Sequence, residues 1–192
     1  MDEQDTGLRT RLVKVGVDLV NREGMQALTL REIARRAGVS HGAPRRYFPT
    51  HLELLSAIAR QGFLELTARG AEIMRDSQAG PRDRLMTLGR AYLDFALSNR
   101  GMFELMFRHD LLESNYLGLR ETSLPLFTVL ADLVAQIRPD AAPHVVSGAL
   151  WANLHGIAQL WAWGSLQVAA GVDDVDTLLR AALDAHLGPE SR

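Results

Sequence analysis

The sequence predicts an all-α protein of about nine helices. Apolar residues recur at helical spacing almost throughout, no segment keeps the strict alternation of a half-buried strand, and glycine or proline stands at the ends of the periodic segments. With 192 residues, 47% of them hydrophobic, the chain can bury a sizeable core in one or two domains.

Glycine and proline mark the expected helix boundaries. Gly24 is expected to end a first helix that begins near Leu8, and Gly38 to end a short second helix. Further boundaries are expected at 80–81, 99–101, 139–140 and 188–189.

Two Thr-x-x-Glu segments predict where helices begin. In residues 29–32 and 50–53, the Thr oxygen can accept the Glu N–H while the Glu side chain reaches back to the Thr N–H. The helix after the second box is expected to run from Leu52 to Met74 and to join the two parts of the chain.

Charge is distributed unevenly along the chain. Residues 7–60 carry ten Arg/Lys against four Asp/Glu, whereas residues 61–192 carry eleven against sixteen. Such asymmetry suggests that the N-terminal part meets a polyanion, although solvated helix faces would give the same count.

Several protein classes are disfavoured. The lack of cysteine excludes disulfide scaffolds, thiolate nucleophiles and cysteine-ligated zinc. The first twenty residues lack the apolar core of a signal peptide, so a cytoplasmic location is expected. His109-Asp110 is the one adjacent His/carboxylate pair, and no nucleophile, phosphate-binding glycine loop or two-histidine metal motif accompanies it. We therefore expect no catalytic residue, metal or cofactor.

Residues 141–172 contain no Asp, Glu, Lys or Arg, which raises the question of a membrane span. Polar residues are spread along this segment, and several would lack partners in lipid. They include Ser147, Asn153, His155, Gln159, Ser165 and Gln167. The segment is therefore expected to be a buried helix, and no membrane contact is expected.

The segment from Thr29 to Phe48 has the pattern of a helix-turn-helix. Its apolar stripe consists of Leu30, Ile33, Ala34 and Ala37. Gly38 supplies a left-handed turn residue, and Ser40 is expected to cap the next helix. That helix would expose residues 41–46 and turn Phe48 inward. A glycine beside two arginines suits the DNA major groove, although an ordinary helical hairpin with a basic surface fits the same pattern.

These residues resemble the DNA-binding domain of the TetR family of bacterial repressors. The matching positions, in order and spacing, are Thr29, Ile33-Ala34, Ala37-Gly38-Val39-Ser40, Tyr47-Phe48 and Leu54-Leu55. The resemblance covers about residues 8–60. It implies a DNA-binding domain at residues 1–52 and a ligand-sensing and dimerisation domain at residues 53–192.

Carried over by position, the resemblance implies nine DNA-binding residues: Thr29, Arg31, Ser40, His41, Gly42, Arg45, Arg46, Tyr47 and His51. Two of them depart from the family pattern. Arg45 replaces a tyrosine that commonly binds phosphate, so it can bind phosphate or read a base. His51 replaces a lysine and is charged only when protonated, so it either makes DNA affinity pH-dependent or has no role.

The C-terminal part resembles the family more loosely. Trp151-Ala-Asn-Leu-His155-Gly156 is similar to the Trp-His-Gly motif of one subgroup, and Trp151 and His155 share a helix face. They either line a ligand cavity, or His155 is a hydrogen-bonded core residue. A pocket for a hydrophobic small-molecule effector is expected near Phe103, Met106, Phe107, Trp151 and His155.

The resemblance implies a homodimer, since two recognition helices must lie about one helical turn apart to read a palindrome. We expect the uncharged 141–166 helix to pair with the last helix. The interface residues would be Gly148, Ala152, Gly156, Leu160, Val175, Leu178, Leu179, Ala182 and Leu183.

The function expected from the sequence is a ligand-released repressor that binds double-stranded DNA at a palindromic operator. The alternatives are an activator, a nucleoid-type binder without sequence preference and, least favoured, a helical enzyme. A binder without preference would need basic charge over more of the surface than residues 7–60 provide.

Overall fold

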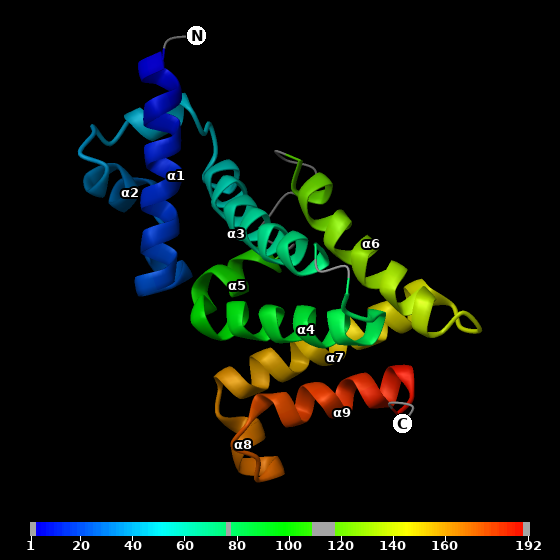
Figure 1. Cartoon of the computed structure of the whole chain (residues 1–192). Coiled ribbons are helices and arrows are strands. Elements are labelled where there is room, and N and C mark those ends of the chain that lie inside the picture. The colour runs from blue at the N-terminus through cyan, green and yellow to red at the C-terminus, as the bar shows by residue number, and fades with distance from the viewer. Residues whose placement is uncertain (1–2, 76–77, 109–117, 190–192) are drawn as a thin grey trace. The chain divides into compact units, whose positions relative to one another are not determined.

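The computed structural model describes residues 3–75, 78–108 and 118–189, and all regular secondary structure in these ranges is helical (Figure 1). The α-helices are α1 Glu3–Glu23, α2 Leu30–Arg36, α3 His51–Met74, α4 Pro81–Ser98, α5 Arg100–Met106, α6 Leu119–Ile137, α7 Pro143–Ala162, α8 Ser165–Ala170 and α9 Val175–Leu187. Two 3₁₀ helices are η1 Met25–Ala27 and η2 Ala43–Arg46. The prediction of an all-α fold with about nine helices is confirmed.

Most helix boundaries lie where glycine or proline predicts them. Gly24 follows α1, Gly38 has a left-handed φ of +67° after α2, and α4 begins at Pro81. The predicted single helix over 141–166 is wrong. Gly164 takes a left-handed φ of +76°, which ends one helix at Ala162 and starts α8 in a new direction.

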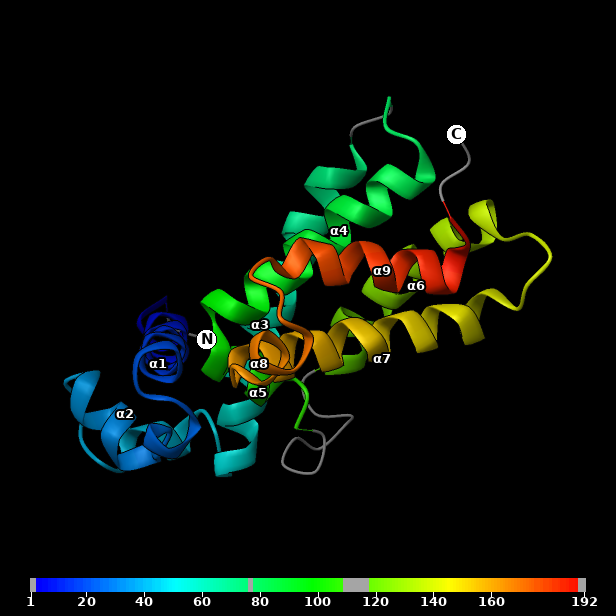
Figure 2. The ribbon, with the colours of Figure 1, turned by 90° about the horizontal axis from the view of Figure 1, so that it is seen from below.

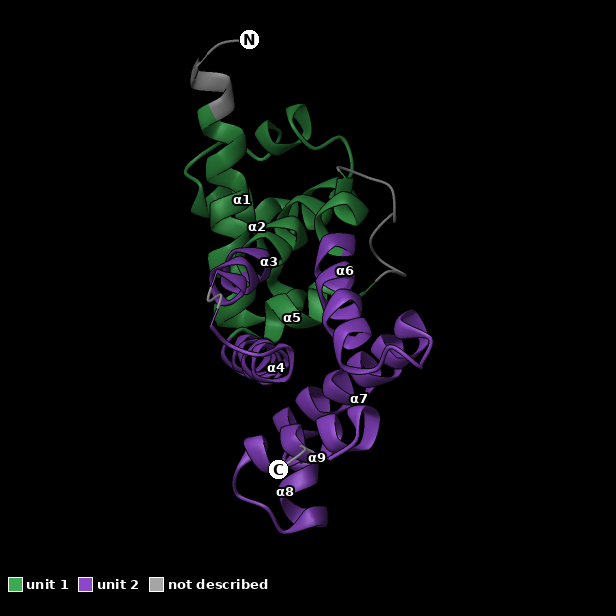
Figure 3. Ribbon diagram, turned by 45° about the vertical axis from the view of Figure 1, so that its right-hand side comes forward, with its two compact units in different colours: residues 1–65, 99–123 green, residues 66–98, 124–192 purple. Residues whose placement is uncertain are grey.

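The chain forms two compact units (Figure 3). Unit 1 contains the described residues of 1–65 and 99–123, and unit 2 those of 66–98 and 124–192. The units differ from the predicted division after residue 52, because unit 1 also includes the first part of α3 and all of α5. The functional division itself stays a prediction.

Unit 1 has a core to which α1, α2, the start of α3 and α5 all contribute. Its fully buried side chains include Leu12, Leu19, Leu28, Ile33, Phe48, Leu54, Ile58, Leu105 and Met106. Two glycines allow close packing: a Cβ at Gly62 would overlap Met102 and Met106, and a Cβ at Gly101 would overlap the backbone carbonyl of Val20. Thus α5 is packed tightly against the C-terminal end of α1.

Unit 2 is built around α7, which packs against α4 and α9 (Figure 2). The α9 side chains Leu179, Ala182 and Leu183 are 0%, 4% and 1% exposed. Leu179 lies where a Cβ on Gly89 of α4 would stand. The prediction that these three residues form a dimer interface is therefore wrong, because they belong to the core of unit 2.

Within the ranges that the structure describes, no helix is both long enough and apolar enough to cross a membrane.

We predict that Gly101→Ala lowers the free energy of unfolding by about 1–3 kcal/mol, because the new methyl group must displace the Val20 backbone rather than a flexible side chain. The matched control is Gly7→Ala on α1, where a Cβ meets nothing within 4 Å. There, better helix propensity should raise stability by up to about 1 kcal/mol. Urea unfolding of both variants measures these changes. Equal changes in the free energy of unfolding would contradict the close packing of Gly101 against Val20.

Candidate nucleic-acid interface

A threonine cap fixes the start of α2. The Glu32 N–H donates to Thr29 Oγ1 at 3.2 Å, which confirms the first half of the predicted capping box. The second half is wrong. The Thr29 N–H donates to the Ala27 carbonyl at 2.8 Å instead, and the Glu32 carboxylate accepts hydrogen bonds from Arg35 and Arg36. In the second predicted box, the Glu53 N–H donates to Thr50 Oγ1 at 3.2 Å.

The helix that follows the turn is shorter than predicted. It is a 3₁₀ helix that begins at Ala43, with Gly42 rather than Ser40 at the cap position. Ser40 instead accepts the Ala43 N–H at its carbonyl, at 3.0 Å. The physical reason is Pro44, which has no N–H to donate and fits only the first turn of a helix.

The turn presents most of the predicted DNA-binding residues to solvent. The exposed ones are Thr29, Arg31, Ser40, His41, Gly42, Arg45, Arg46 and His51, whereas Tyr47 is half-buried. Phe48 is 1% exposed, as the inward orientation predicts, and the Arg9 guanidinium lies 5.1 Å from the centre of its ring. We call residues 41–46 the reading segment.

His51 has a local hydrogen bond that the sequence does not predict. Its Nε2 lies at hydrogen-bond distance from the Leu28 carbonyl oxygen, so this nitrogen carries the proton and donates. The bond ties the first residue of α3 to the chain that leads into α2. A contact between His51 and DNA stays a prediction.

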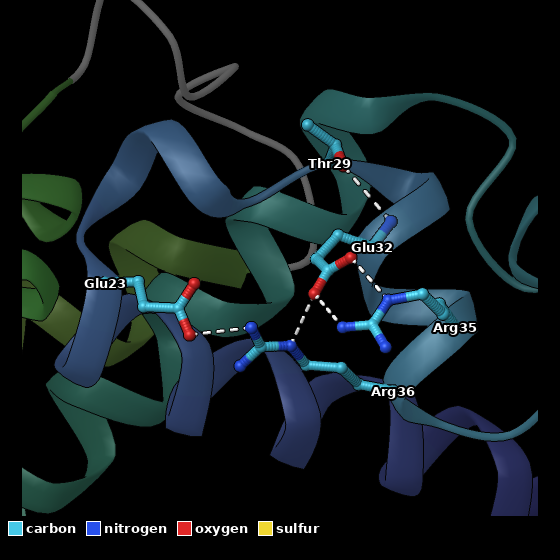
Figure 4. A network of polar contacts seen from close by, with 5 residues as sticks. All are labelled: Glu23, Thr29, Glu32, Arg35 and Arg36. Atoms are coloured by element: carbon cyan, nitrogen blue, oxygen red, sulfur yellow. Dashed lines mark hydrogen bonds and ion pairs between the residues drawn. The ribbon is translucent and has the colours of Figure 1, made fainter.

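Four charged residues form a network between α1 and α2 (Figure 4). Arg35 holds Glu32 with two hydrogen bonds of 2.8 and 2.6 Å. Arg36 donates from Nε to Glu32 and from Nη2 to Glu23, both at 2.6 Å. Sequence reasoning missed this network, although the spacings of Glu32 to Arg35 and Arg36 are typical of helical ion pairs.

Hydrogen bonds from Arg35 and then Arg36 lower the pKa of Glu32 from 4.5 to about 2. Because the folded-state pKa lies below the ordinary one, the network stabilises the folded protein fully above about pH 4.5. Its contribution is lost as the pH falls towards 2. At neutral pH, two arginines of this basic region are thus engaged by carboxylates.

The five predicted effector residues fall into both compact units. Phe103, Met106 and Phe107 belong to unit 1, where the Phe103 and Phe107 rings meet edge to face at 5.0 Å. Trp151 and His155 belong to unit 2. The structure also has a groove of about 690 Å³ between α1 and α3, lined by residues that include Arg9, Lys14 and Arg60. None of the five predicted residues lines this groove.

Tyr92 of α4 joins Trp151 and His155 in one polar cluster. Trp151 Nε1 donates to the Tyr92 oxygen at 3.1 Å, and that oxygen lies 2.9 Å from His155 Nδ1. Burial lowers the pKa of His155 and raises the pKa of Tyr92 above its usual range. Both groups are therefore neutral near pH 7. Tyr92 was missed because no local pattern links it to α7.

The other predicted interface residues lie mostly on an open face of α7. Ala152 is exposed, Leu160 is 39% exposed, and a Cβ at Gly148 or Gly156 would meet nothing within 4 Å. Val175 and Leu178 of α9 are half-buried. His109-Asp110, the pair considered for catalysis, lies outside the described residues.

The chain matches two family descriptions. Residues 12–58 match the bacterial regulatory proteins of the tetR family, and residues 85–186 match the tetracyclin repressor-like C-terminal domain. A capped helix-turn-helix joined to such a domain defines a DNA-binding transcription regulator rather than an enzyme. The chain belongs to the TetR family, as the resemblance implied. Membership of the Trp-His-Gly subgroup stays a prediction.

Solved structures and curated proteins agree with this family. A protein of unknown function from Rhodococcus sp. RHA1 is 31% identical, with a TM-score of 0.78 over 94% of this chain and 93% of that one. Thermus thermophilus FadR, a repressor solved with lauroyl-CoA, shares the fold at 24% identity, with a TM-score of 0.67 over 96% of each chain. The nucleoid occlusion factor SlmA of Glaesserella parasuis is 28% identical over 53% of this chain. The chain spans about half the length of the curated relatives it matches.

Proposed function

We propose that this regulator is a homodimeric repressor that binds a palindromic operator through its reading segment and is released by an apolar small molecule. The observation that carries the proposal is the exposure of Arg45 and Arg46 on a short 3₁₀ helix and of Gly42 just before it. A glycine lets the backbone approach the bases, and arginine can pair bidentately with guanine. The proposal places the protein in the cytoplasm, at the nucleoid.

The open face of α7 supports the homodimer. Its apolar row follows helical spacing and contains the exposed Val145, Ala149, Ala152 and Leu160, the half-buried Gly156 and, just after α7, Trp163. Val145 is 71% and Trp163 72% exposed. Small residues in the middle of the row allow two helices to approach closely, and apolar residues at its ends add area to bury. To read a palindrome, a two-fold pair must hold two reading segments about 34 Å apart, one turn of DNA.

We predict that Ala152→Glu raises the dimer dissociation constant at least about tenfold, since it places an uncompensated charge inside the proposed interface. Ala71→Glu, on an exposed site of α3, is the matched control and should leave assembly unchanged. Sedimentation equilibrium measures both. A wild-type protein that remains monomeric at micromolar concentration would refute the dimer.

The cluster of Tyr92, Trp151 and His155 supports an effector site in unit 2. Trp151 is 38% exposed and lies edge to face with Phe127 at 6.4 Å, so an aromatic surface adjoins a polar one. An effector role for Phe103, Met106 and Phe107, which belong to unit 1, stays a separate prediction. Thermus thermophilus FadR, which shares the fold, is solved in complex with lauroyl-CoA, and this supports an apolar ligand for the proposed site.

We predict that a hydrophobic compound which raises the melting temperature also weakens DNA binding, because it must favour the form that does not bind DNA. Trp151→Phe should reduce the shift in melting temperature. Val168→Ala, at a residue of α8 that is 87% exposed and lies outside both the cluster and the α7 row, should leave it unchanged. The effector proposal fails if no hit from such a thermal-shift screen affects DNA binding.

We predict that Arg46→Ala weakens binding by about 1–3 kcal/mol to a duplex that the wild-type protein selects from a random pool, and relaxes preference at one base pair. Arg75→Ala removes the same charge from an exposed turn just after α3, and it should change neither the affinity nor the base preference. Titrations at several salt concentrations test both variants. A uniform loss on all sequences, with a salt slope smaller by about one, would show a phosphate contact instead.

The SlmA relative favours one alternative, a nucleoid protein without an inducer. If random duplex binds as tightly as any selected duplex at matched salt, this alternative replaces the operator-specific repressor.

A further inference from the structure

Arg36 joins two helices that the sequence places apart. Its guanidinium bonds Glu32 in its own helix and Glu23, thirteen residues earlier, in the last turn of α1. The α2 helix has only seven residues, and so short a helix is not stable without tertiary contacts. The orientation of α2, and of the reading segment that follows it, depends on such contacts.

The network holds its side chains more firmly than a single surface ion pair does. The Arg36 and Glu32 side chains are 31% and 28% exposed, so both are partly shielded from water. One planar guanidinium bonds two carboxylates at 2.6 Å, an arrangement that a flexible, singly bonded pair does not match. Arg35, by contrast, is 63% exposed and bonds only within α2 among these four residues.

The network also changes what the arginines can do on DNA. Arg35 and Arg36 belong to the basic N-terminal part of the chain and lie directly before the turn. An arginine that is held by carboxylates displaces few of the counterions condensed on DNA, because it does not neutralise a phosphate. Arg36 is therefore poorly suited to hold phosphate and well suited to hold α2 against α1.

We propose that Arg36 is a positioning residue for DNA reading, which acts by fastening α2 to the end of α1 through Glu23 and makes no phosphate contact. The inference rests on the proposed reading of DNA by residues 41–46. It also predicts an unexpected effect of removing the charge of Glu23. By simple electrostatics, removing a negative charge near a DNA-binding head should strengthen DNA binding. Loss of the Arg36–Glu23 contact between α2 and α1 should instead weaken DNA binding.

The test is a double-mutant cycle with Arg36→Gln, Glu23→Gln and the double variant. The probes are a duplex selected by the wild-type protein from a random pool and a random duplex of equal length. We expect each single variant to bind the selected duplex about three- to tenfold more weakly than the wild-type protein. The double variant should lose no more affinity than either single variant. The dependence of affinity on salt concentration should stay unchanged. Arg35→Gln, the matched control, should have a much smaller effect.

Hydrogen exchange separates positioning from unfolding. Amides of α2 should exchange faster in Arg36→Gln and Glu23→Gln, while amides of α7, in the other unit, keep their protection. Tighter DNA binding by Glu23→Gln, or a salt slope reduced by about one in Arg36→Gln, would overturn the inference but leave the proposed function intact. If the wild-type protein selects no duplex, the proposed function fails and this inference fails with it.

Discussion

Burial of Phe48 is the constraint on which the rest of the DNA-binding head depends. The 3₁₀ helix before it has four residues and cannot hold its own shape in water. Phe48 anchors it, since its side chain is fully buried and its N–H donates to the Pro44 carbonyl at 2.9 Å. Pro44 is itself buried, which leaves Arg45 and Arg46 to face solvent. Alternation of buried and exposed side chains thus turns a short segment into a reading surface.

Features encoded by neighbouring residues could be predicted from the sequence. The Thr29 cap, the left-handed Gly38 and the inward Phe48 each depend on residues within a few positions. Predictions failed where residues compete for the same partner. Glu32 does not bond back to Thr29, because two guanidinium groups offer stronger, charge-assisted hydrogen bonds. Pro44 likewise overrides Ser40 as the determinant of the helix start.

Contacts between distant residues explain the remaining differences. Tyr92 and His155 are 63 positions apart, so no local pattern joins them. An apolar stripe predicts that a helix face is buried, but it does not tell whether the same chain or a second copy buries it. The stripe of α9 with Leu179 and Leu183 is covered within unit 2, whereas the row on α7 is left open. The uncharged composition of α7 reflects both faces, one in the core and one at the proposed dimer interface.

The claim that two copies of residues 41–46 lie in the major groove can be measured directly, because the chain contains no cysteine. His41→Cys creates a single attachment point for an iron chelate that cleaves nearby DNA. The account predicts cleavage at two positions about one helical turn apart on a selected duplex, related by a two-fold axis. Cleavage at one position only, or spread evenly along the duplex, would contradict it.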